Sequence, residues 1–252
     1  MAKWTKKEKS IIFLVVIVTL LLAFPQNVFA MHIMEGYLPA VHCVSWGVIC
    51  LPFLAAGVIN IRRTIKEKPR ALILLAMSGA FIFVISSLKI PSVTGSCSHM
   101  TGTGLGAILF GTASTSILGI IILVFQAILL AHGGLTTLGA NTFSMAIAGP
   151  VFTVLLYKLG KKCNWNRKVN IFIAAAMGDI FTYCVTSVQL ALAYPGESGG
   201  VITSLLKFLG VFAPTQLPLA VIEGIMTVLI IMGLESFAAT ELKEIGFYKG
   251  GK

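Results

Sequence analysis

The chain has 252 residues, of which 57% are hydrophobic and 11% are charged. Soluble domains carry roughly 25% charged residues, so this composition excludes an ordinary soluble protein. Several apolar runs are roughly 20 residues long, the length that crosses a bilayer, and they predict an all-α membrane protein. The formal net charge is +10. The cations lie in loops between apolar runs, which is typical of signals for membrane orientation and not of a nucleic-acid-binding surface.

Residues 1–30 have the three parts of a secretory signal peptide. Residues 1–10 carry four lysines and one glutamate, an uncharged apolar run follows, and the small residue Ala30 ends the stretch. This order is typical of a cleaved signal, and an uncleaved signal anchor is the alternative. Cleavage after Ala30 would leave 31–252 as a single transmembrane domain that begins with Met31.

The remaining apolar runs are separated by loops of contrasting charge. The long runs cover about 38–60, 71–90, 105–131, 142–159, 169–193 and 216–237, with a shorter stretch at 201–212. The loops at 62–70 and 158–168 each carry five Lys or Arg residues, whereas the loop at 91–104 carries none. Because Lys and Arg collect in cytoplasmic loops, we expect the first two loops inside and the third outside.

The run at 105–131 determines the number of helices. If Met31 lies outside, a single helix here would place the basic loop at 158–168 outside as well, against the charge rule. Two passes, near 104–114 and 115–131, return that loop and the basic C-terminal tail to the cytoplasm. Four glycines in the first of these stretches and just before it allow close backbone approach. We therefore expect about seven transmembrane helices in the mature chain.

Met31 and His32 form the clearest candidate metal-binding motif. After cleavage, the amine of Met31, the amide nitrogen of His32 and its imidazole Nδ1 can bind one ion in two small chelate rings. These nitrogens share a plane and leave a fourth position open. His99 is the best fourth donor, because it lies in a glycine-rich outer loop without cations. Planar nitrogen coordination suits Ni(II) or Cu(II), and Co(II) also fits.

Five other residues are weaker candidates. Glu35 either orients the amino-terminal loop or is a solvated carboxylate. Asp179 and Glu223 lie inside apolar runs, where a carboxylate is a functional candidate, although each could equally bond to nearby hydroxyls. His42 and His132 are interpreted as ordinary hydrogen-bonded residues. We keep His132, with the three carboxylates, as a residue that could orient the ligands or couple the site to the helices.

Two catalytic patterns are absent from the sequence. It contains no His-Glu-x-x-His and no Gly-x-x-x-x-Gly-Lys-Ser/Thr. These absences disfavour a zinc protease, and they indicate that any ATP hydrolysis needs another subunit. GESGG at 196–200 matches Gly-x-Ser-x-Gly, but it follows an apolar run of helical length and no predicted strand, so it is not interpreted as a hydrolase nucleophile. The five cysteines are an odd number without a Cys-x-x-Cys pair, so no disulfide framework is expected. We expect no enzymatic activity from the chain itself.

Long segments resemble the CbiM/NikM family, the substrate-capture (S) components of energy-coupling factor importers for cobalt and nickel. The segments are MHIMEGYLP at 31–39, GSCSHMTGTGLGAILFG at 95–111 and AHGGLTTLGANTFSMAIAGP at 131–150, and weaker similarity appears at 177–193 and 218–224. The resemblance runs over essentially all of 31–252. One departure is Met100, because family members often have proline after the motif histidine.

The resemblance implies a seven-helix subunit that captures Co(II) as a transported substrate for cobalamin biosynthesis, with no organic cofactor. It implies ligation by Met31, His32 and His99. It also implies a bacterial plasma membrane location, with the mature N-terminus outside and the C-terminus cytoplasmic. The implied partners are a CbiN-like accessory protein, a CbiQ-like coupling protein and CbiO-like ATPase subunits. Nickel capture is the alternative within transport, and a non-transporting metal sensor or accessory protein is the alternative outside it.

Overall fold

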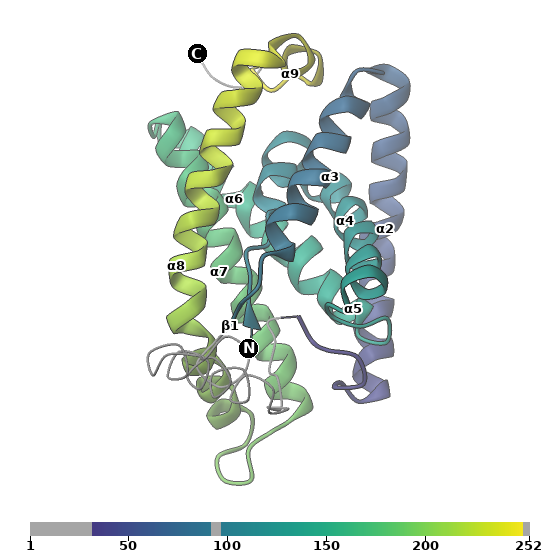
Figure 1. Cartoon of the computed structure of the whole chain (residues 1–252), viewed down its shortest axis with the longest axis vertical. Coiled ribbons are helices and arrows are strands. Elements are labelled where there is room, and N and C mark those ends of the chain that lie inside the picture. Colours follow the sequence, from purple (N-terminus) through teal and green to yellow (C-terminus); the bar gives the residue numbers. More distant parts are fainter. Residues whose placement is uncertain (1–31, 92–96, 249–252) are drawn as a thin grey trace, which may run out of the picture.

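The computed structural model describes residues 32–91 and 97–248 as an elongated bundle of helices that run along a common axis (Figure 1). The elements are α2 (Ala40–Glu67), α3 (Ala71–Ser87), β1 (Ile90–Pro91), β2 (Cys97–Ser98), α4 (Thr103–Leu130), α5 (Leu138–Asn141), η1 (Thr142–Ala148), α6 (Gly149–Lys162), α7 (Arg167–Ala193), α8 (Gly200–Phe237) and α9 (Ala239–Ile245). The two strands form one short antiparallel pair. The expected all-α membrane fold is confirmed. The predicted signal peptide and Met31 lie outside the described residues.

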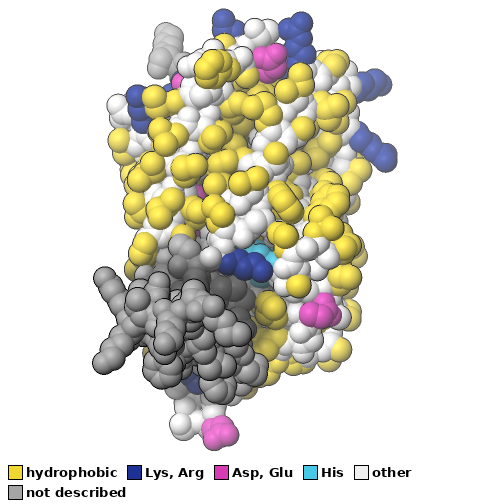
Figure 2. Space-filling model, in the orientation of Figure 1, with side chains coloured by type: hydrophobic (Ala, Val, Ile, Leu, Met, Phe, Trp, Pro, Cys, Tyr) yellow, Lys and Arg dark blue, Asp and Glu magenta, His cyan; other side chains and the backbone are white. Residues whose placement is uncertain are grey.

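Five helices in the described part of the chain are long and apolar enough to cross a membrane. They are α2, α4, the continuous unit Leu138–Lys162 formed by α5, η1 and α6, α7 and α8. Helix α3 is apolar but has only 17 residues. Hydrophobic side chains cover much of the face drawn in Figure 2, as a lipid-facing surface requires. The expected number of about seven is approximate, and it is reached only if α4 counts as two segments.

Helix α4 breaks at Gly111, where the chain reverses direction. Gly111 has φ 79° and ψ 172°, a backbone conformation that favours glycine. In one continuous helix, Gly106 and Thr115 would be about 13 Å apart along the axis. Instead, a Cβ added to Gly106 would lie 3.2 Å from Oγ1 of Thr115. The expected break is therefore present at Gly111, slightly earlier than predicted. The segment of α4 before Gly111 is too short to cross a bilayer alone.

Helix α8 joins two stretches that the sequence analysis treated as separate. The apolar stretches at 201–212 and 216–237 belong to one helix of 38 residues, with Pro214 and Pro218 inside it. Each proline removes one backbone hydrogen bond, which membrane helices tolerate when neighbouring groups compensate. The prolines therefore did not end the helix, and the expectation of a separate short stretch was wrong.

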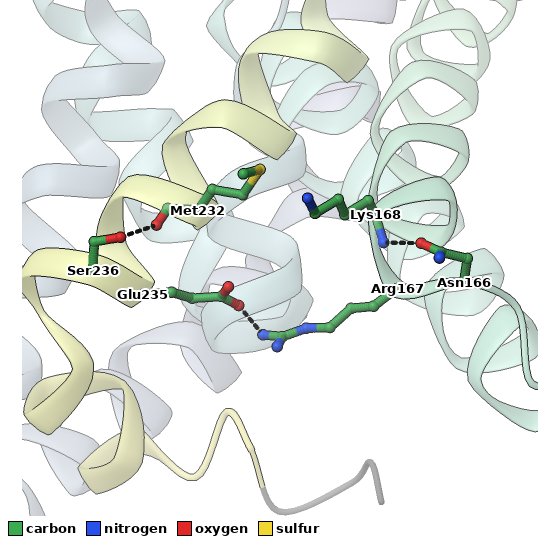
Figure 3. Close-up of polar contacts among 6 residues, drawn as sticks. All are labelled: Asn166, Arg167, Lys168, Met232, Glu235 and Ser236. Carbon is green, nitrogen blue, oxygen red and sulfur yellow. Dashed lines mark hydrogen bonds and ion pairs between the residues drawn. The ribbon is translucent and has the colours of Figure 1, made fainter.

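One end of the bundle holds two turns and the C-terminal segment. The turns join α2 to α3 and α6 to α7. Nζ of Lys68 donates to the backbone oxygen of Ile245 at 3.3 Å. Arg167, at the start of α7, forms an ion pair with Glu235 near the end of α8 (Figure 3). Lys and Arg side chains gather at this end in Figure 2. The two basic loops and the tail thus lie on the same side, as the charge rule requires.

Candidate metal centre

The loop 32–39 carries His32 and is held in the bundle by the segment that follows α4. The backbone N–H of Ile33 donates to Oδ1 of Asn141 at 2.9 Å, and Nδ2 of Asn141 donates to the Ile33 oxygen at 3.0 Å. The hydroxyl of Thr137 donates to the same oxygen at 2.6 Å. Both backbone polar groups of the residue after His32 are therefore fixed, and His32 itself is buried.

Two glycines allow this loop to lie against the bundle. Gly133 has φ +77°, and a Cβ there would lie 3.2 Å from Nδ2 of Asn141. A Cβ on Gly134 would lie 2.5 Å from the Cα of Glu35, so any larger residue would push the backbone of the loop away. Because the glycines directly follow His132, the same close approach brings that imidazole to the loop.

His99 lies between β2 and α4, fully buried, in a segment that α7 and α8 hold in place. Its Nδ1 donates to the backbone oxygen of Met100 at 2.8 Å, which leaves the lone pair on Nε2. Nε2 of Gln216 donates both to the backbone oxygen of His99, at 3.2 Å, and to Oδ2 of Asp179, at 2.6 Å. The Nε2 atom of His99 therefore has a free lone pair that can bind a cation.

Glu223 holds the same segment two residues further along. Its Oε2 accepts the backbone N–H of Thr101 at 2.6 Å, and its Oε1 accepts the Thr101 hydroxyl at 2.8 Å. The carboxyl groups of Glu223 and Asp179 are also close enough to interact electrostatically. Both carboxyl groups are buried in the helix bundle. The two intramembrane carboxylates therefore connect α7 and α8 to the segment that carries His99.

The imidazoles of His32, His99 and His132 meet, although they come from three separate loops. Nδ1 of His32 contacts Nε2 of His99. The ring centroids lie 4.3 Å apart for His32 and His99, and 4.5 Å and 4.8 Å from His132 to His32 and to His99. One nitrogen from each ring can be chosen so that all lie within 4.8 Å of one another. Nitrogens bound to one ion at ~2 Å lie about 3 to 4 Å apart, so the cluster can surround a single ion.

The three imidazoles are neutral at neutral pH because burial opposes their charged form. Burial lowers the pKa of His32 well below its ordinary value, that of His99 to about 4 and that of His132 to about 2. The positive charge of Lys89 also lowers the pKa of all three rings. Neutral imidazoles keep a lone pair for a metal ion. Within the described residues, Nε2 of His32 and both ring nitrogens of His132 have no hydrogen-bond partner.

The predicted site residues do not all belong to one cluster. His32 and His99, predicted as ligands, are in contact, whereas Met31, predicted to supply the terminal amine, lies outside the described residues. Glu35 is exposed and accepts the backbone N–H of Thr136 at 3.2 Å, so it fastens the loop at the surface. His42 belongs to α2 and is not part of the histidine cluster.

Sequence reasoning missed several residues that position the site. Thr137 and Asn141 hold the loop of His32, whereas Thr101 and Gln216 connect His99 to the carboxylates. The first two lie in the 131–150 segment that carried the family resemblance, and that segment was the signal that could have drawn attention to them. The polar pair Thr215-Gln216 between two prolines was the corresponding signal for Gln216.

Comparison with known proteins places the chain among cobalt transport proteins. A family model described as "Cobalt uptake substrate-specific transmembrane region" matches residues 32–240. The "Cobalt transport protein CbiM" of Lachnoclostridium phytofermentans is 62% identical over 246 residues, which are 98% of each chain. The protein of the same description from Ruminiclostridium cellulolyticum is 53% identical over 235 residues, which are 93% of this chain and 95% of the relative.

Two solved structures share the fold. A structure described as a transition metal transporter is 25% identical, with a TM-score of 0.70, and the match covers 82% of this chain and 93% of the other. A truncated transition metal transporter is 24% identical, with a TM-score of 0.70 and coverage of 82% and 99%. The family match includes every loop of the histidine cluster. The chain therefore belongs to the CbiM family, whose members are transmembrane components of cobalt uptake.

Proposed function

We propose that the chain captures Co(II) at the outer face of a bacterial plasma membrane, as the S component of an ATP-driven energy-coupling factor importer that supports cobalamin biosynthesis. The observation that carries the proposal is the contact between Nδ1 of His32 and Nε2 of His99 in a buried site of a CbiM family member. The ion is the transported substrate. The chain has no enzymatic role of its own, and release depends on the separate ATPase subunits.

Four nitrogen donors fit this arrangement. After signal peptide cleavage, the amine of Met31 and the amide and imidazole nitrogens of His32 would occupy three corners of a plane, and the ion would displace the proton of the amide. Nε2 of His99 takes the fourth corner, next to the imidazole of His32. Donors on neighbouring corners are the closest pair in such a site, which agrees with the contact between these two rings. Because the Nδ1 hydrogen bond to Met100 leaves Nε2 of His99 unprotonated, no proton opposes binding at that corner.

Nickel is the alternative cargo, because planar nitrogen coordination suits Ni(II) as well. Metal analysis of the purified mature protein tests the identity of the ion. Uptake of labelled Co(II) by cells tests transport, with and without the CbiQ-like and CbiO-like partners and the CbiN-like accessory protein. Uptake only when the ATPase subunits are present supports the importer. Firm binding without uptake in any combination would instead support a sensor or accessory protein.

We place the mature N-terminus outside and the C-terminus in the cytoplasm. The support is the gathering of Lys and Arg at the end of the bundle opposite to the start of α2 (Figures 1 and 2). Arg63, Lys66 and Arg70 are exposed there. The loop of the histidine cluster that precedes α2 then lies on the outer side, from which a captured ion would arrive.

Cysteine labelling of intact cells tests this orientation. In a background without native cysteines, Lys66→Cys should react only with reagents that enter the cytoplasm. Glu197→Cys is the matched variant, because Glu197 is exposed between α7 and α8, at the opposite end of the bundle. It should react with an impermeant reagent added outside. Labelling of Lys66→Cys by the impermeant reagent would overturn the orientation.

We also propose that Asp179 and Glu223 couple the helices to the bound ion. Both carboxylates contact the segment that carries His99. Gln216 hydrogen-bonds both to Asp179 and to the backbone oxygen of His99. Glu223 accepts the backbone N–H of Thr101. The contacts from Gln216 and Glu223 come from α8. A tilt of α8 would therefore move the Nε2 atom of His99 away from His32. Such a movement gives the coupling protein a direct way to open the site.

Glu223→Gln should lower the affinity for Co(II) by roughly tenfold to a hundredfold, the usual cost of losing a group that orients a ligand. The carboxylate accepts two hydrogen bonds from Thr101, and an amide places a donor at one of these positions. The measurement is a competition titration of the purified protein. Glu235→Gln is the control, because it removes a carboxylate at the other end of the same helix (Figure 3). Equal losses in the two variants would exclude a specific role for Glu223.

A further inference from the structure

We propose that the groove between α2, α3 and the second half of α4 binds one anionic phospholipid, with an acyl chain in the groove and its phosphate on Arg62, Lys66 and Arg70. This binding site lies outside the histidine cluster and goes beyond the capture of an ion. With the orientation proposed above, the lipid belongs to the cytoplasmic leaflet of the membrane. Binding of the lipid does not depend on which ion the chain captures.

The groove is an apolar hollow on the surface of the bundle. Helices α2 and α3 both pack against α4, which forms the floor, but they make few contacts with each other. The hollow has a volume of about 450 Å³, and every residue that lines it is apolar or glycine. Ala76, Gly79 and Ala80 of α3 give it depth, because their short side chains leave the space open. A Cβ added to Gly79 would meet only the side chain of Leu118, at 3.7 Å.

The dimensions of the groove fit a single acyl chain. On α3 the lining residues run from Leu72 to Phe83, a rise of roughly 16 Å along a helix. This length is about half of the hydrocarbon core of a bilayer, so the groove spans one leaflet. A partner helix would occupy roughly 1,200 Å³ over the same length, more than twice the volume of the groove. The groove therefore admits one acyl chain, and a helix could only lie across its rim.

Basic residues surround the cytoplasmic end of the groove. Two residues of α2, Ile61 and Ile65, line the groove. Each is followed directly by a cation, Arg62 or Lys66. Arg70 lies just before the first residue of α3. All three cations are exposed, and none of them forms an ion pair in the described part of the chain.

The other charged residues of this turn are already engaged. Arg63 forms an ion pair with Glu67, with 2.7 Å between Nε and Oε1. Nζ of Lys68 donates to the backbone oxygen of Ile245 at 3.3 Å. Glu67 is the only acidic residue in the stretch 62–70. The three remaining cations therefore have no counter-charge in this stretch, and a bound anion would supply one.

A phospholipid with an anionic head group matches both parts of this surface. Basic clusters and pockets on the cytoplasmic side of transmembrane helices attract anionic lipids. The guanidinium groups of Arg62 and Arg70 can each bind a phosphate through two parallel hydrogen bonds. A zwitterionic lipid carries an additional ammonium group, which the same cations repel. We therefore expect phosphatidylglycerol to bind in preference to phosphatidylethanolamine.

Native mass spectrometry of the purified mature protein tests this inference. The protein is released from nanodiscs that contain phosphatidylglycerol and phosphatidylethanolamine in equal amounts, and the ratio of the two bound lipids is measured. We expect enrichment of phosphatidylglycerol on the wild-type protein. In Arg62→Ala/Lys66→Ala the ratio should fall about tenfold or more, because each cation attracts anionic lipid. Lys162→Ala/Lys168→Ala is the matched control, since it removes two exposed cations of the other basic loop, and it should keep the wild-type ratio.

A second variant tests the groove itself. Ala76→Phe places an aromatic ring in the hollow and should abolish retention of phosphatidylglycerol, although every cation is unchanged. Ala55→Phe is the control, because Ala55 is exposed on α2 and does not line the groove. If Ala76→Phe does not fold, as judged by size-exclusion chromatography, Ala80→Leu fills the same hollow with a smaller side chain.

The outcomes decide this inference separately from the proposed function, because the readout is the mass of a bound lipid. A wild-type protein without a preference for phosphatidylglycerol overturns it, as does an unchanged ratio in Arg62→Ala/Lys66→Ala. Retention of the lipid by a folded groove variant also overturns it, because the acyl chain would then lie elsewhere. Cross-linking of Ala76→Cys to the CbiQ-like protein in the complete complex, with no lipid bound to the purified chain, would show that a protein helix covers the groove instead. Failure of the same samples to bind Co(II) would affect only the proposed function.

Discussion

Replacing His99 with alanine should abolish tight Co(II) binding, with a loss of affinity of more than about a hundredfold. Groups that only orient a metal ligand typically cost roughly tenfold to a hundredfold when they are removed, so loss of the ligand itself should cost more. The Nε2 atom of His99 contacts the imidazole of His32 and is the best donor for the fourth planar position. Titration of the purified mature protein with Co(II) measures the effect.

The variant leaves the surrounding segment largely intact. The backbone oxygen of His99 still accepts from Gln216, and Thr101 still donates to Glu223, because neither contact involves the imidazole. The protein should therefore remain folded in detergent, which circular dichroism and size-exclusion chromatography can verify. His42→Ala provides the control for removal of a histidine outside the cluster. Wild-type affinity in His99→Ala would remove this residue from the site.

Blocking cleavage after Ala30 should produce a folded, membrane-inserted protein that does not bind Co(II) tightly. A large residue at the cleavage position, as in Ala30→Leu, prevents processing because the position requires a small side chain. Met31 would then carry an amide in place of a free amine, and one corner of the planar site would be lost. Amino-terminal sequencing reports the processing, and metal analysis of the same sample reports the binding.

Ala30→Ser is the matched control for this experiment. Serine is small, so cleavage and metal binding should both persist. The experiment also separates the contribution of the amine from that of the imidazoles, because His32, His99 and His132 remain in the uncleaved chain. Firm binding by a protein that still begins at residue 1 would contradict the role of Met31.

The sequence alone predicted the all-α membrane class and most of its helices, because these depend on local properties. Apolar runs of bilayer length predict helices, and the distribution of Lys and Arg orders their ends. The same rule required a break within 105–131, and the structure has one at Gly111. It did not predict the continuity of α8, because proline is tolerated in a membrane helix where the neighbouring structure satisfies the freed backbone groups. That compensation is a tertiary property.

The candidate metal site likewise depends partly on local sequence and partly on tertiary contacts. The chelate formed by Met31 and His32 could be proposed from sequence, because its donors lie within two consecutive residues and their geometry is local. The position of His132 could not, because its imidazole reaches His32 only when Asn141 and two glycines bring the amino-terminal loop against the end of α4.

The sequence by itself thus determined the fold class, whereas the chelating pair at the start of the predicted mature chain stays a prediction. Only the tertiary structure decided which distant groups surround that pair. The contacts from Gln216 to His99 and from Glu223 to Thr101 each join residues more than a hundred positions apart. Periodicity and charge distribution describe the surroundings of each segment separately. Contacts between distant segments arise only when the helices pack, so no local pattern specifies them.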